Sequence, residues 1–164
     1  MMLGFGWWHL RSTREPLRFA SLEDTQAIDA LTDTADELLW KTFREWMTSN
    51  QEPYIQWQLH EHLNNHDGLL TFCVSRNHRT SKVWTMLEWI AQNGSGSYGL
   101  FYCHDDEDTM NQCRLGRQPP IDYDNVFQVH RLMNGRIIEL NDPFFGSIEG
   151  NIDPVHPYNR PSHE

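Results

Sequence analysis

The sequence is poor in cysteine and has no long hydrophobic run. It holds three cysteines, Cys73, Cys103 and Cys113, and no CxxC pair. An odd, scattered set argues against a disulfide framework and against a four-cysteine zinc site, and it favours a reducing compartment. No stretch approaches the ~18 apolar residues of a membrane span, and residues 1–10 lack the basic start and apolar run of a signal peptide. We therefore expect a cytoplasmic protein.

Positive charge is also scarce, and this restricts the partners. The chain has 13 Lys and Arg against 23 Asp and Glu, so its formal net charge is -10. Such a field repels nucleic-acid phosphates and anionic membranes, and it attracts basic surfaces. We expect no binding to nucleic acid or to membranes. A basic protein surface is the natural complement.

Catalytic motifs are missing as well. The sequence contains no GxSxG, HExxH or Walker motif. His60 and His62 form a His-x-His step, which can bind a metal, within an alternating segment. Next to Gln56 and Gln58, such a pair more often lies on the solvent-exposed face of an antiparallel sheet. We expect no catalytic residue, no metal and no cofactor. The alternative is a metal-dependent hydrolase that uses His60, His62 and an acidic loop.

Aromatic residues, in contrast, are abundant. They make up 12% of the 164 residues, and each ring can bury about 150–250 Å². We expect a single domain over residues 1–144, followed by a polar, proline-containing tail over residues 145–164. Trp7 and Trp8 point to opposite faces of the expected first strand, so one of them lies away from the helices, where an exposed ring suits an interface.

Hydrophobic periodicity predicts the order of the elements. Alternation predicts strands over residues 3–10, 55–60, 70–74, 98–103, 126–133 and 136–140, and helical spacing predicts helices over residues 21–50 and 80–93. The apolar stripe expected on the first helix consists of Ile28, Leu31, Ala35, Leu38, Leu39, Thr42 and Trp46. Asn134-Gly135 is a strong hairpin signal. The order predicts an α+β fold, with a ferredoxin-like βαββαβ core, two helices on one face of a mostly antiparallel sheet, and a C-terminal β-hairpin.

The densest run of acidic residues in the sequence directly follows the expected strand over residues 98–103. It lacks the spacing and the mid-loop glycine of an EF-hand, so a dedicated cation loop is not expected. A charge run is as often only a solvated loop, but acids at a strand end can also contact a cluster of Lys and Arg. Two further acids would join this run if the next loop folds back. The resulting acidic patch consists of His104, Asp105, Asp106, Glu107, Asp108, Asp122 and Asp124.

Several motifs occur in a recognisable order. They are Asn77-His78-Arg79, residues 84–91, 96–100 and 104–108, Phe127-Gln128-Val129, and Gly135, Glu139 and Asp142-Pro143-Phe144. Together they resemble the immunity protein 7 family of bacterial polymorphic toxin systems. The resemblance implies a small cytosolic protein, encoded beside a secreted or contact-delivered toxin, that binds the toxin domain and blocks it.

The resemblance and the charge together lead to a functional expectation. We expect a non-enzymatic immunity protein that neutralises its cognate toxin domain by stoichiometric inhibition, with the acidic patch as the toxin-binding site. The charge favours a nuclease as the toxin, because a nuclease has a basic substrate groove. Electrostatic steering would speed capture, and buried aromatic rings would hold the complex. The sequence does not specify the oligomeric state.

Overall fold

The computed structural model describes residues 1–13, 22–63, 67–78, 80–105 and 127–141. These residues form two helices and six strands in the expected order. The elements are β1 (Met2–Leu10), α1 (Leu22–Ser49), β2 (Ile55–Leu63), β3 (Asp67–Arg76), α2 (Lys82–Asn93), β4 (Tyr98–Asp105), β5 (Phe127–Met133) and β6 (Arg136–Asn141). Within the described part of the chain, neither helix combines the length and the hydropathy needed to cross a membrane.

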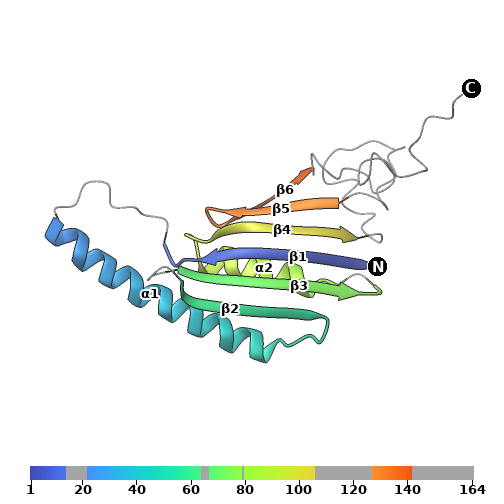
Figure 1. Cartoon of the computed structure of the whole chain (residues 1–164), viewed down its shortest axis with the longest axis horizontal. Helices are drawn as coiled ribbons and strands as arrows, with labels where there is room; N and C mark the ends of the chain where they lie inside the picture. Colours follow the sequence, from blue (N-terminus) through green and yellow to red (C-terminus); the bar gives the residue numbers. More distant parts are fainter. Residues whose placement is uncertain (14–21, 64–66, 79, 106–126, 142–164) are drawn as a thin grey trace, which may run out of the picture.

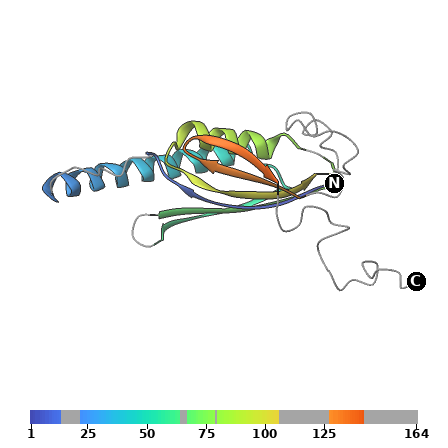
Figure 2. The ribbon, with the colours of Figure 1, turned by 90° about the horizontal axis from the view of Figure 1, so that it is seen from above.

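The strands form a single sheet in the order β2-β3-β1-β4-β5-β6 (Figure 1). Every neighbouring pair is antiparallel. The first four strands have the ferredoxin-like arrangement, in which β1 lies between β3 and β4. The β5–β6 hairpin extends the sheet beyond β4, and both helices lie on the same face (Figure 2). The predicted α+β fold, with its antiparallel sheet and C-terminal hairpin, is therefore confirmed.

We call the face under the helices the covered face, and it holds the hydrophobic core. Alternation along β1 points Trp8 and Leu10 into this core, where both are fully buried. The indole Nε1 of Trp40 on α1 donates a hydrogen bond of 2.9 Å to the Leu10 carbonyl. At Gly68 a Cβ atom would overlap the Trp40 indole, so only glycine allows α1 to approach β3 this closely. Trp7 lies on the opposite face and is half-buried, which identifies it as the outward-pointing ring of the pair.

The buried side of α1 differs from the expected stripe. Leu31 and Leu38 are 71% and 63% exposed, so their predicted burial was wrong. From residue 29 onward, where the side chains of the helix are described, the buried positions are Asp36, Leu39, Trp40, Phe43 and Met47. The first turns of α1 extend past the ends of the strands (Figure 2). Leu38, further along, lies on the side of the helix that faces away from the sheet.

The β5–β6 hairpin closes as its sequence predicts. Asn134 and Gly135 have φ angles of 59° and 65°, and two consecutive positive values are typical of a type I′ turn. The turn sets the register in which Met133 pairs with Arg136 and Arg131 pairs with Ile138. Paired residues in antiparallel strands point to the same face, so this register decides which side chains of the hairpin face away from the helices.

Candidate functional site

The structure places the first two residues of the acidic patch inside the sheet. His104 pairs with Leu3 on β1, and Asp105 pairs with Met2. The strand continues because β1 still offers backbone partners there, so the prediction that the chain leaves the sheet after Cys103 was wrong. His104 and Asp105 are only 6% and 3% exposed. The other five members, Asp106, Glu107, Asp108, Asp122 and Asp124, lie outside the described residues. Toxin binding by the acidic patch therefore stays a prediction.

Alternation predicts that the two histidines of the alternative hydrolase site lie on one face of their strand. The structure shows that they do not. His60 pairs with Leu69 on β3, but the register shifts between His60 and Leu63. His62 adopts a φ of 57° in this irregularity, and its ring packs edge-on against Trp40 of α1 with the centroids 5.3 Å apart. Among the described residues, no group of three His, Cys, Asp or Glu side chains lies close enough together to hold a metal.

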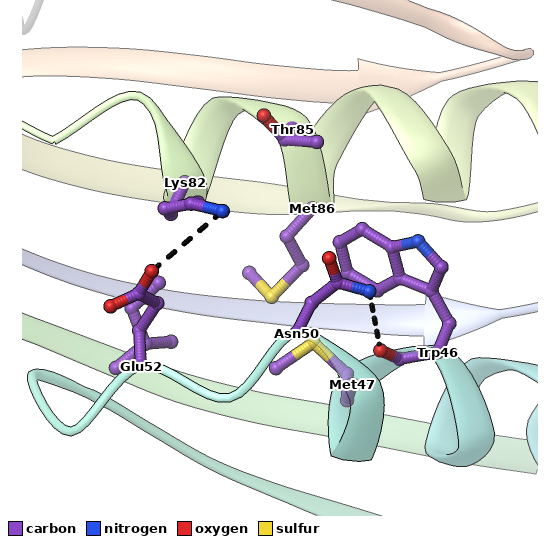
Figure 3. A pocket seen from close by; sticks show the side chains of 8 residues that line it. Trp46, Met47, Asn50, Glu52, Lys82, Thr85 and Met86 are labelled. Carbon is purple, nitrogen blue, oxygen red and sulfur yellow. Dashed lines mark hydrogen bonds and ion pairs between the residues drawn. The ribbon is translucent and has the colours of Figure 1, made fainter.

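A small pocket lies between the end of α1 and the start of α2 (Figure 3). Lys82 Nζ and Glu52 Oε1 lie 3.8 Å apart across it, and the Asn50 side chain donates to the Trp46 carbonyl at 2.8 Å. The cavity volume is about 10 Å³, which is room for about one water molecule. The lining residues are Trp46, Met47, Asn50, Glu52, Ile55, Lys82, Thr85 and Met86. A pocket of this size does not hold an organic substrate.

A much larger feature is the face of the sheet that neither helix covers (Figure 2). The strand register places Trp7 opposite Leu100, and Phe5 opposite Tyr102, on this side. Phe5 is 57% exposed. Exposed large apolar side chains that gather on one surface are typical of an interaction site. We call the following set the open apolar face: Leu3, Phe5, Trp7, Tyr98, Leu100, Tyr102, Phe127, Val129, Met133, Ile138 and Leu140.

The open apolar face covers β1, β4, β5 and β6 and stops at β3. On β2 the outward positions carry Gln56, Gln58 and His60, which pair with Cys73, Thr71 and Leu69 of β3. The same side of one sheet is therefore polar over its β2 edge and apolar over β1, β4, β5 and β6. Such a boundary between an apolar centre and a polar border is typical of protein interfaces.

Two arginines lie within the open apolar face. Arg131 pairs with Leu100 on one side and with Ile138 on the other, and Arg136 pairs with Met133. In the described part of the chain, neither guanidinium has a hydrogen bond or an ion pair, and Arg131 Nε is buried without an acceptor. No Asp or Glu is among the side chains that the structure describes on this face. The described side chains of the face are thus locally basic, in a chain whose net charge is -10.

Comparison with known proteins identifies the family of this chain. A family model described as immunity protein 7 matches residues 2–154. The chain belongs to this family. Neither a curated protein nor a solved structure gives a significant match. Members of the family are immunity proteins of toxin systems, so this immunity protein has a cognate toxin as its partner. The resemblance seen in the second half of the sequence is therefore confirmed, and the match extends over β1, α1 and β2 as well.

For an immunity protein, the open apolar face is the feature that sequence reasoning located only in part. The outward ring at position 7 or 8 was predicted, but the surrounding surface was not. A signal was present in β4, where Tyr98, Leu100 and Tyr102 alternate with Phe101 and Cys103, so that both faces of the strand are apolar. A strand that is apolar on both faces is expected to be covered on both. In this structure the helices cover only one.

Proposed function

We propose that this immunity protein neutralises a nuclease toxin of a polymorphic or contact-dependent system by one-to-one binding. The net charge of -10 is the observation that supports a nuclease as the toxin. A nuclease binds phosphates through a basic groove, and an acidic inhibitor complements that groove. The protein would act in the cytoplasm, without catalysis, by occluding or flanking the groove.

Part of this negative charge lies on the described part of α1 before Lys41. Asp29, Asp33, Asp36 and Glu37 precede Lys41, the first basic residue of the helix. Asp36 is buried, where it accepts a hydrogen bond of 2.6 Å from the Ser12 amide. Asp29 and Glu37 are exposed. A surface of one sign raises the rate at which an oppositely charged partner arrives. This segment would add to the steering field of the acidic patch.

Titration of the toxin tests one-to-one neutralisation. The toxin domain encoded beside this gene is purified, and its cleavage of DNA and RNA is measured with increasing amounts of the immunity protein. We expect cleavage to stop at about one molar equivalent, as a tight complex with a typical interface of about 1,200–2,000 Å² would give. A neighbouring toxin without nuclease activity would refute the nuclease assignment, and a toxin that remains active at excess inhibitor would refute neutralisation.

The steering role of the acidic patch has its own test. Asp106→Lys should slow association with the toxin at low salt, and the difference should shrink at high salt because ions screen exposed charges. Glu88→Lys, on the exposed side of α2, is the matched control with the same change in net charge. An association rate that responds equally to both variants would show that only net charge matters. An unchanged rate for Asp106→Lys would remove the patch from the encounter.

A further inference from the structure

We propose that the toxin docks on the open apolar face, where a carboxylate of the toxin pairs with Arg131 and Arg136. This inference rests on the proposed function, in which the chain binds a toxin, and it names the surface that holds the complex. The acidic groups then govern the rate of encounter, whereas the open apolar face governs the lifetime of the complex.

The residue types of the face are those that interfaces favour. Interface cores are enriched in Tyr, Trp, Phe, Met and Arg and depleted in Lys, Glu and Asp. Together with the two arginines that lie within it, the open apolar face contains all five enriched types, for example Trp7, Tyr98, Met133 and Arg131. On α1, by contrast, the two exposed leucines are accompanied by exposed residues of the types that interfaces disfavour, which are Asp29, Glu37, Lys41 and Glu45. The sheet is therefore the better surface to bury in a stable complex.

Several rings of this face already pack on one another. His9 stacks on Tyr98 with the centroids 4.8 Å apart, and Tyr102 stacks on Phe127 at 5.0 Å. Both stacks involve β4, which is paired on both sides by β1 and β5. Rings held in this way lose little side-chain freedom when a partner covers them, so more of the burial energy contributes to affinity.

The arginines define the chemistry of the occupant. Arg131 Nε is a buried donor without an acceptor, held between Leu100 and Ile138. A partner carboxylate would satisfy it, and a guanidinium can hold a carboxylate through two parallel hydrogen bonds. The described part of the open face supplies no acid for this purpose. The occupant is therefore an apolar surface with a carboxylate in it, which is a local property and is compatible with a basic groove elsewhere on the toxin.

The same charge argument disfavours a second copy of the chain. A two-fold dimer through this face would place the same surface against itself. As far as the side chains are described, the contact would then contain the arginines of both copies and no carboxylate to pair with them, and like charges in an interface weaken it. The toxin is a partner that can bring the missing group.

Two pairs of variants test the docking surface, with the dissociation constant for the purified toxin as the readout. Phe5→Ser should weaken binding about tenfold or more, whereas Leu38→Ser, at a similarly exposed position on α1, should change it by less than about twofold. Arg131→Glu should weaken binding more than Lys41→Glu, which makes the same charge change on exposed α1. Arg131→Lys should recover only part of the affinity, because an ammonium lacks the planar fork.

A photo-crosslink makes the test independent of these substitutions. Phe5→p-benzoylphenylalanine keeps an aromatic ring on the open apolar face, and irradiation should join it to the toxin, whereas the same amino acid at Leu38 should not crosslink. Circular dichroism and thermal unfolding show whether each variant is folded.

The outcomes separate this inference from the proposed function. Wild-type affinity in Phe5→Ser and Arg131→Glu, or a toxin crosslink only from position 38, overturns the docking surface while neutralisation stands. A wild-type chain that does not bind the toxin overturns the proposed function itself. Sedimentation that shows a dimer of the free chain, lost in Phe5→Ser, assigns the face to a second copy and also overturns the inference.

Discussion

The two faces of the sheet use similar side chains in different ways. On the covered face, Trp8, Phe72 and Phe101 lie under two helices and are buried. On the opposite side, Phe5, Trp7 and Tyr98 come from two of the same strands but remain accessible to solvent. Apolar character alone therefore does not define the core of this protein. The position of the helices does, and it leaves a second apolar surface available for a partner.

The largest expected contrast between the faces is in stability. Trp40→Ala removes a buried indole from the covered side together with its hydrogen bond to the Leu10 carbonyl, so unfolding should become easier by about 3–5 kcal/mol. Phe5→Ala removes a ring from the open side and should change stability by less than about 0.5 kcal/mol. Urea unfolding monitored by circular dichroism measures both. Equal losses would mean that the open apolar face belongs to the folding core.

A histidine on the covered face should make stability depend on pH. His130 on β5 packs against Trp84 with the ring centroids 4.5 Å apart, and burial lowers its pKa from 6.5 to about 4. Well above pH 6.5 the residue is neutral in both states. As the pH falls from 6.5 to 4, the unfolded chain binds a proton that the folded chain does not, and stability decreases by up to about 3 kcal/mol.

His130→Leu separates this contribution from those of other titrating groups. The difference in unfolding free energy between the variant and the wild type should grow in favour of the variant as the pH falls from 6.5 to 4. Urea titrations at several pH values across this window provide the measurement. If the two curves run parallel, His130 is not the group whose titration weakens the covered face.

Part of this contrast was predictable from the sequence. The order of elements followed from periodicity, and the Asn134-Gly135 turn fixed the last hairpin, because these signals depend on local chain geometry. The burial of Leu31 and Leu38 was predicted wrongly because the periodicity of α1 does not show where the sheet beneath it ends or which side faces it. The separation of His60 and His62 was missed because one residue with positive φ breaks the alternation. The position of the open apolar face depends on which face of the sheet the helices pack against. Alternation separates the two faces but does not show which of them is covered.

Gly68 tests how closely the covered face is packed. Gly68→Ala would drive a methyl group into the Trp40 indole, so we expect a loss of about 1–3 kcal/mol as the ring or α1 shifts. Ser75→Ala, on the exposed side of the same strand, is the control and should be nearly neutral. Thermal unfolding of both variants gives the answer. A neutral Gly68→Ala would show that α1 can move away from β3 without cost, and that the contact between them is loose.

The smallest expected effect concerns the exposed leucines of α1. Leu31→Lys and Leu38→Lys should each change stability by less than about 0.5 kcal/mol and leave toxin affinity within about twofold, although both side chains are more exposed than Phe5. Single exposed apolar residues are common on folded proteins, whereas a contiguous set is not. Unfolding and binding measurements on the same variants distinguish the two situations. A strong loss of affinity here would move the docking surface from the sheet to α1, because exposure would then matter more than contiguity.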